Sequence, residues 1–270
     1  MLKSTRRHFF HIGYHGARYS GWQKLSKAIT VQEVIETALS KILKQPVAIN
    51  GCGRTDAKVH ASQYFFHADI PDNLDFDLLF RLNKLLPDDI AVFDIIPMQG
   101  DPHARFDGVI RTYDYFIHNY KDPFLSNFSS LYPDQDLDLD AMKKAVSILP
   151  HYTDFRALCK TPDRIEHTIC HVKSAGLYID GNGSKLRFNI TANRFLYKMI
   201  RITVGRLLEI GKGQMSTDEF EFYIANKQTP PIIIPAHPQG LYLSKVTYRY
   251  LDLEPRSAFS LLNSTDWYPL

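Results

Sequence analysis

The segment of the sequence best suited to chemistry is residues 51–60, Gly-Cys-Gly-Arg-Thr-Asp-Ala-Lys-Val-His. It lies between two segments with strand-like patterns, and its glycines allow a tight turn and a close approach to a ligand. If the chain is extended here, the side chains of Arg54 and Asp56 point to the same side and can form an ion pair. An arginine beside a carboxylate favours the ionised form, which a nucleophile or a base needs at neutral pH. The segment therefore predicts a charged and oriented carboxylate.

The same residues also fit a turn with a purely structural purpose. A local Arg–Asp pair at a protein surface is common and contributes little to stability. Composition and spacing by themselves favour this structural interpretation. The choice between a turn and a reactive site therefore depends on the rest of the chain.

Residues 53–61, Gly-Arg-Thr-Asp-Ala-Lys-Val-His-Ala, closely resemble the signature of the TruA-type tRNA pseudouridine synthases. Further segments similar to landmarks of that family follow in the family's order over nearly the whole chain: residues 19–23, 31–33, 83–90, 103–106, 111–115, 193–201 and 240–243. A single Gly-Arg-Thr-Asp is weak evidence, whereas an ordered series is specific. The resemblance implies that Asp56 is the catalytic residue.

The resemblance also implies a reaction. Pseudouridine formation breaks the bond between ribose C1′ and uracil N1, turns the base and rejoins it through C5. Such chemistry requires an ionised carboxylate, a pocket that retains the base and a proton acceptor, so neither a cofactor nor a metal is expected. A paired uridine must first be flipped out of its stem. Whether Asp56 attacks the sugar or removes a proton from it is left open.

By the same resemblance, three further residues are expected to bind the substrate. Arg54 is expected to keep the catalytic carboxylate ionised and oriented. Tyr113 is expected to lie against the uracil ring, and Arg201 is expected to face the carboxylate or a phosphate. Without the resemblance, Tyr113 would indicate core packing of a strand, and Arg201 a solvated charge on a helix.

Lys58 departs from the family's signature, which usually has glycine two residues after the aspartate. Either the backbone at this position does not need a positive φ angle, or the loop bends differently. We expect the lysine side chain to be solvated or to face phosphate. His60 and His103 receive no chemical role, because loop histidines usually make structural hydrogen bonds.

Periodicity predicts the elements that must position these residues. In the first half we expect strands near residues 10–14, 47–50, 64–70 and 90–96, and helices near 31–42 and 75–86. In the second half we expect strands near 109–118, 169–179, 185–190 and 240–248, and helices near 138–149, 193–210 and after Ser216. The predicted fold class is α+β: two split β-α-β halves, ferredoxin-like or RRM-like, with largely antiparallel sheets and an active-site cleft between them.

The two halves correspond to two predicted domains. An N-terminal domain over residues 1–106 carries the Asp56 motif, and a C-terminal domain over residues 107–270 carries Tyr113 and a basic helix, with residues 98–107 as the link. No family landmark explains the tail, residues 251–270.

Basic residues suggest where RNA would bind. Arg194, Lys198 and Arg201 recur at helical spacing, so they are expected to share one face of the predicted helix. Arg105 and Arg111 flank the predicted link. Such groups would line a positive cleft and bind RNA locally, although the chain as a whole is nearly neutral.

Composition argues against several other classes of protein. Of the 270 residues, 44% are hydrophobic and 23% charged, which is typical of a folded protein and excludes a disordered one. The net charge of +3 permits a nucleic-acid partner without requiring it. Three cysteines without framework spacing argue against a disulfide-built secreted protein. No apolar run is long enough to span a membrane, so the cytoplasm is the expected location and no membrane partner is expected.

Two other functions compete with this interpretation. A non-catalytic RNA-binding module of RRM-like fold could stack bases on sheet aromatics at residues 64–66, Tyr113 and Tyr115. A zinc site could use Cys159, His167, Cys170 and His171, although their spacing is irregular. The resemblance favours the enzyme. It implies tRNA as the partner, the anticodon stem-loop as the target region and a homodimer as the assembly.

Overall fold

The computed structural model describes residues 5–134, 136–256 and 267–270. The chain forms two compact units: Met1–Val109 with Tyr242–Phe259, and Ile110–Leu241 with Ser260–Leu270. The predicted boundary between residues 106 and 107 lies close to the first division. The prediction did not include the return of residues 242–259 to the first unit.

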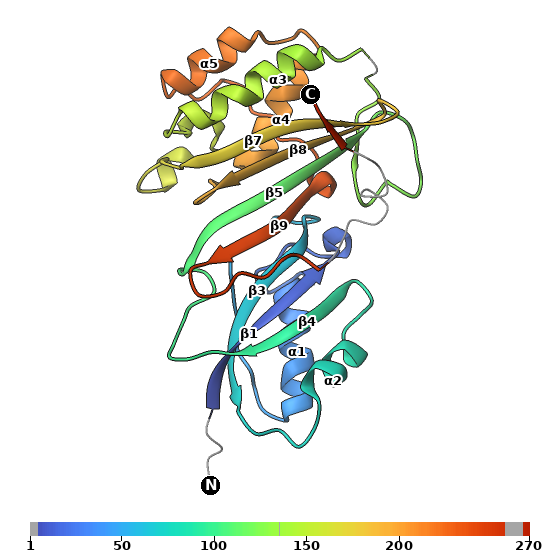
Figure 1. Ribbon diagram of the computed structural model, residues 1–270, viewed down its shortest axis with the longest axis vertical. Helices are drawn as coiled ribbons and strands as arrows, with labels where there is room; N and C mark the ends of the chain where they lie inside the picture. The colour runs from blue at the N-terminus through green and yellow to red at the C-terminus, as the bar shows by residue number, and fades with distance from the viewer. Residues whose placement is uncertain (1–4, 135, 257–266) are drawn as a thin grey trace. The chain divides into compact units, whose positions relative to one another are not determined.

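The first unit is built on an open, mostly antiparallel sheet (Figure 1). Its strand order is β9-β3-β1-β4, formed by Leu241–Tyr248, His60–Pro71, Thr5–Tyr14 and Ile90–Pro97. Strand β1 is antiparallel to β3 and β4, whereas β9 is parallel to β3. The short strand β2 (Asn50–Gly51) pairs with β3. Helices α1 (Val31–Leu43) and α2 (Leu78–Leu85) contact each other beside this sheet, and a 3-10 turn, η1 (Gly16–Arg18), follows β1.

Both faces of the central strands β1 and β3 are buried. On one face Phe10 and Phe66 stack with ring centroids 4.5 Å apart. On the other face Phe65 meets the ring of Tyr248 edge-on at 5.4 Å. Burial on both faces explains why these strands carry runs of aromatic residues rather than a strict alternation of apolar and polar ones.

Two connecting segments cover the second face of this sheet. The backbone N–H of Ala104 donates to His67 Nδ1 at 3.1 Å, and the Tyr248 hydroxyl donates to the Ala104 carbonyl at 2.8 Å. The Gln63 side-chain amide donates to the Leu253 carbonyl at 2.9 Å. These bonds attach residues 98–107 and 249–256 to β3 and β9.

In the second unit the strands follow the order β10-β7-β8-β5, and neighbours in this order are antiparallel. These strands are Trp267–Pro269, Val172–Asp180, Lys185–Ala192 and Gly108–His118, and β6 (Ser130–Leu131) pairs in parallel with β5. Helix α3 (Leu139–Ile148) packs against α4 (Met199–Gly211), α5 (Thr217–Ala225) and β7. The end of the predicted tail thus forms an edge strand, while its residues 257–266 lie outside the described residues. Among the described residues, no helix is long and apolar enough to cross a membrane.

The predicted α+β class with mostly antiparallel sheets is confirmed, and so are several helix starts. Thr30 accepts a hydrogen bond from the Glu33 N–H, Asp138 from Ala141 and Ser216 from Glu219, so each caps its helix. These caps join residues three positions apart, which is why helix starts can be predicted from local sequence.

One helix prediction was wrong at its start. Helix α4 begins at Met199 rather than near residue 193, because Lys198 has a left-handed backbone with φ 59°. Before it, Asn193 exchanges hydrogen bonds with the backbone of His171 instead of entering a helix. Arg194, Lys198 and Arg201 therefore do not share a helical face. The side chain of Arg194 instead contacts the ring of His167 at 3.0 Å.

One strand prediction needed correction. Of residues 47–50, only Asn50 belongs to a strand, because Ser40 and Glu36 on α1 accept the backbone N–H groups of Val47 and Ile49. Strand β9 forms where a strand was predicted near residues 240–248. Its parallel pairing with β3, with His60 opposite Tyr242, was not part of the prediction.

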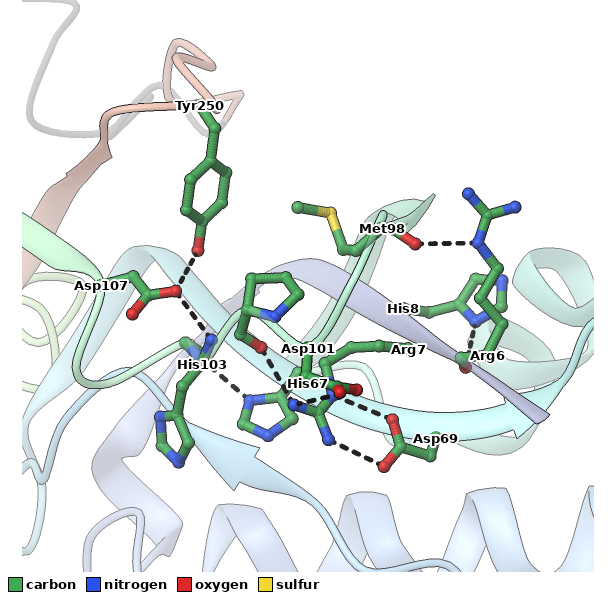
Figure 2. A network of polar contacts seen from close by, with 12 residues as sticks. Arg6, Arg7, His8, His67, Asp69, Met98, Asp101, His103, Asp107 and Tyr250 are labelled. Carbon is green, nitrogen blue, oxygen red and sulfur yellow. Dashed lines mark hydrogen bonds and ion pairs between the residues drawn. The ribbon is translucent and has the colours of Figure 1, made fainter.

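His67 links the 98–107 segment to β3 in its neutral form (Figure 2). Burial, with the charges of Arg7 and His103, lowers the pKa of this histidine to about 4, against opposing effects of Asp69 and Asp107. Protonation of Nδ1 would break the bond from Ala104. Because the folded-state pKa lies below the ordinary value of about 6.5, the unfolded chain takes up the proton first.

We therefore expect His67 to make the protein less stable as the pH falls from about 6.5 towards 4 and to have its full stabilising effect above that range. The free energy of unfolding in urea should fall over this range by up to about 3 kcal/mol more in the native protein than in His67→Gln. Parallel pH profiles for the two proteins would contradict the assignment.

Candidate active site

Asp56 lies in the loop between β2 and β3, here called the Asp56 loop (residues 52–59). Its side chain is half-buried, whereas those of Arg54 and Lys58 are exposed. The loop itself contains no helix or strand. Its position depends instead on hydrogen bonds and close contacts with residues distant in the sequence.

Strand β3 holds the start of the loop. The Cys52 N–H donates to the Phe65 carbonyl at 2.7 Å, and the Tyr64 hydroxyl donates to the Gly53 carbonyl at 2.6 Å. Tyr64 is fully buried, and its ring stacks on Trp22 with centroids 4.1 Å apart. Because the Tyr64 ring is fixed in this way, its hydroxyl holds the Gly53 backbone at a fixed distance from the sheet.

The rest of the loop is held by residues 14–22, here called the 14–22 segment. The hydroxyl of Tyr14 is 2.8 Å from that of Thr55. The Trp22 N–H donates to the Thr55 carbonyl at 3.3 Å, and the Lys58 N–H donates to the Tyr19 carbonyl at 3.1 Å. These bonds hold the backbone on both sides of Asp56.

Two glycines of the 14–22 segment permit this close approach. A Cβ on Gly21 would lie 2.4 Å from the Thr55 carbonyl oxygen, and one on Gly16 would lie 2.0 Å from the Val59 carbonyl oxygen. Gly21 also has φ +93°, which L side chains rarely adopt. Residues 19–23 are a landmark of the family resemblance, but no sequence pattern indicates that they hold the Asp56 loop.

The backbone turns directly after Asp56. The Val59 N–H donates to the Asp56 carbonyl at 3.2 Å, and Lys58 has φ 65°. The position where the family usually has glycine therefore does adopt the left-handed conformation in this chain. Of the two explanations offered for Lys58, the first is wrong: the positive φ angle is retained, and the exposed lysine adopts it.

The predicted ion pair between Arg54 and Asp56 is not formed. Within the described parts of the chain, no ion pair or hydrogen bond joins these two side chains, and the Arg54 side chain is exposed. The prediction assumed that the segment is extended, whereas the chain turns at residues 56–59. The described contacts that hold the backbone of Asp56 come from the 14–22 segment and from β3.

In the second unit, Tyr113 lies on β5 opposite Ile190 of β8. It is half-buried, and its ring meets that of Phe195 edge-on at 5.0 Å. Phe195 was not predicted as a site residue, because the sequence placed it inside a helix. The next residue, Asp114, is 2% exposed and accepts hydrogen bonds from Arg187 at 2.7 Å and Asn189 at 2.8 Å.

Arg201 lies in the first turn of α4 and is half-buried. Its Nε donates to the Ala236 carbonyl at 2.7 Å, and the Ala236 N–H donates to the Arg201 carbonyl at 2.8 Å. The side chain is thus oriented by a backbone segment rather than left as a solvated helix charge.

His60 and His103 make structural hydrogen bonds, as expected. His60 is fully buried and accepts the Gly16 N–H at 2.9 Å. His103 accepts the N–H of Arg105 at 3.1 Å. In each histidine, Nδ1 therefore orders the backbone around it.

Neither competing function is supported by the geometry. Of the sheet aromatics proposed for base stacking, four are at most 1% exposed and Tyr113 is half-buried; the four are Tyr64, Phe65, Phe66 and Tyr115. Among the described residues, no group of three or more histidine, cysteine or carboxylate side chains could hold a metal ion. Cys159 and Cys170 are buried, and burial raises the pKa of the Cys170 thiol to about 12.

The glycine contact predicts a stability difference. Gly21→Ala should cost about 1–3 kcal/mol, because the new methyl group meets the Thr55 carbonyl and the φ angle is strained. Hydrogen exchange at the Lys58 amide should accelerate as well. The control is Gly100→Ala, since Gly100 also has a positive φ angle but nothing within 4 Å of the added Cβ. Equal losses in both variants would show that the contact is unimportant.

The conformation of Lys58 predicts a gain in stability. Lys58→Gly should stabilise the protein by about 0.5–1 kcal/mol, because glycine adopts the left-handed region without the strain of a Cβ. Urea unfolding of this variant is compared with that of Lys121→Gly, which replaces another exposed lysine and should destabilise. A loss of stability in both variants would refute the expectation.

Comparison with known proteins finds relatives that share one name. A family model described as tRNA pseudouridine synthase matches residues 152–249. The chain is 38% identical over 245 residues to a tRNA pseudouridine synthase A of Porphyromonas gingivalis, covering 90% of this chain and 97% of that relative.

Similar matches come from other bacteria. The chain is 40% identical over 248 residues to a relative of the same name from Parabacteroides distasonis, covering 90% and 96% of the two chains. It is 33% identical over 241 residues to one from Streptococcus pneumoniae, covering 88% and 96%. With this identity over almost the full length of its relatives, the chain belongs to the tRNA pseudouridine synthase A family.

Proposed function

We propose that this protein converts uridine to pseudouridine in tRNA and that Asp56 supplies the reacting carboxylate. The observation that carries the proposal is the Gly-Arg-Thr-Asp motif of this family, on a loop whose backbone is held by close contacts on both sides of the aspartate. Such holding orients a reactive group.

The reaction is balanced without any other reactant. The bond between ribose C1′ and uracil N1 breaks, the base turns, and a bond forms between C1′ and C5. The proton that leaves C5 is matched by the proton that N1 carries in the product. Asp56 acts either as a nucleophile at C1′ or as a base towards a ribose proton.

The other proposed site residues would act on the substrate. Tyr113 presents a half-buried ring braced by Phe195, which suits contact with the flat uracil. The exposed guanidinium of Arg54 is better placed to meet a tRNA phosphate than to orient Asp56. Arg201, oriented by Ala236, would meet a phosphate or the carboxylate of Asp56 when the uridine is bound.

The finer parts of the proposal come from the family resemblance. The uridines are expected in the anticodon stem-loop of tRNA, the enzyme is expected to act as a homodimer, and the cytoplasm is its expected location. Neither a metal nor a cofactor is part of the proposed reaction. Mapping pseudouridine along an unmodified tRNA transcript would identify the modified positions.

Substitution of the carboxylate tests the central claim. Asp56→Asn should lower pseudouridine formation by roughly 10³-fold or more, because an amide is neither a comparable nucleophile nor a base. Its affinity for the transcript should stay within about threefold, since the loop backbone is held by other residues. Carbodiimide labelling with reverse transcription measures the product, and filter binding measures the affinity.

The matched control is Asp75→Asn, which removes an exposed carboxylate from the same unit. This variant should convert uridine at the native rate. Conversion at the native rate by Asp56→Asn would refute the proposed role. A wild-type protein that forms no pseudouridine in any tRNA would refute the proposed function as a whole.

A further inference from the structure

The turn at residues 103–107 exposes an aromatic ring from a firmly held backbone. Phe106 is 75% exposed. An exposed aromatic side chain is usually found on a surface where it can move. Here the backbone beneath it is fixed by side chains from several parts of the first unit.

Hydrogen bonds within the turn fix its shape. His103 Nδ1 accepts the N–H groups of Arg105 at 3.1 Å and Phe106 at 3.4 Å. The Asp107 N–H donates to the His103 carbonyl at 3.1 Å. The Asp107 carboxylate accepts the His103 N–H at 2.8 Å and the Tyr250 hydroxyl at 2.9 Å (Figure 2).

The turn is also anchored to the sheet. Ala104 is fully buried, its N–H donates to His67 on β3, and its carbonyl accepts the hydroxyl of Tyr248 on β9. The backbone that carries the exposed Phe106 ring is therefore attached directly to buried residues of the sheet. Fixing a surface ring in this way removes the entropy cost of ordering it on binding.

The ring itself is part of an aromatic stack. The His103 ring meets the buried His67 ring edge-on at 4.6 Å and lies 4.3 Å from the Phe106 ring, tilted by 35°. The guanidinium carbon of Arg105 is 5.9 Å from the Phe106 ring centroid. A flat apolar face beside a positive charge suits a flat aromatic ligand that carries a phosphate.

We propose that Phe106 stacks against an unpaired base of the tRNA substrate, with Arg105 beside the adjoining phosphate. The inference rests on the proposed function, because it takes RNA as the ligand. Unpaired RNA bases are commonly bound by stacking on aromatic side chains.

The position of the turn along β3 indicates that it affects tRNA binding and not the chemical step. His60, next to the Asp56 loop, and His67, which anchors the turn, are separated by roughly 20 Å along β3. The stacked base is therefore a different nucleotide from the uridine that reacts. Phe106 contributes to tRNA binding and leaves the chemical step unchanged.

Phe124 provides a matched control. It is 78% exposed, and its backbone is also capped, since Asp122 accepts the Phe124 N–H at 2.8 Å. Among the described residues, no other ring and no guanidinium lies against the Phe124 side chain. It thus has the exposure of Phe106 without the braced ring and the adjacent positive charge.

The first experiment measures affinity and turnover separately. Phe106→Ala should weaken binding of the anticodon stem-loop about 5- to 150-fold, the range for losing one stacked base. Its turnover at saturating RNA should stay within about twofold. Phe106→Trp should bind within about threefold of the native protein, because it keeps an aromatic face. Phe124→Ala should leave both values unchanged.

A second experiment identifies the base. Each unpaired nucleotide of the stem-loop is replaced in turn by an abasic one, and Kd is measured for the native protein and for Phe106→Ala. With one of these RNAs the difference between the two proteins should disappear, because the stacking partner is already absent.

Three results would overturn the inference while leaving the proposed function intact. One is native affinity of Phe106→Ala in a protein that still converts uridine. Another is an equal loss of affinity with every abasic RNA, which would indicate a structural role. The third is a shift in oligomeric state on sedimentation that accounts for the lost affinity, since Phe106 would then contact a second copy of the chain.

Discussion

The close approach of the 14–22 segment to the Asp56 loop is the constraint on which the proposed chemistry depends. Two peptide carbonyls of the loop lie where a Cβ on Gly16 or Gly21 would be, so the two backbones touch without side chains between them. This contact places Asp56 between two hydrogen bonds, one that Trp22 donates to Thr55 and one that Tyr19 accepts from Lys58. An aspartate on a loop without such contacts would sample many positions. A reaction at one carbon atom requires the carboxylate to stay close to a single position.

The charges around Asp56 have a different use from the one their spacing suggested. Arg54 and Lys58 are both exposed, and Arg54 forms no ion pair with Asp56 in the described parts of the chain. An exposed cation lowers the stability of the free protein very little, and it can neutralise phosphate when RNA binds. In the proposed function, the held backbone positions the Asp56 loop, and exposed cations attract the substrate.

In the second unit, irregular backbone again positions the candidate residues. Phe195, which braces Tyr113, belongs to the non-helical residues before α4, and Ala236, which orients Arg201, lies between α5 and β9. Both connections are anchored by hydrogen bonds to their neighbours. Tyr113 and Arg201 themselves lie on β5 and α4, and the loops bound to these elements orient their side chains.

The sequence by itself determined the α+β class, the helix starts near residues 31, 138 and 217, and the motif that identifies Asp56. These features depend on residues close together in the chain, where propensity, capping and alternation act. The tertiary structure alone decided that Arg54 does not pair with Asp56, that α4 begins at Met199 and that β9 pairs with β3. Each of these depends on a partner distant in sequence, such as the His171 backbone for Asn193 or Gly21 for Thr55, and local patterns carry no information about such partners.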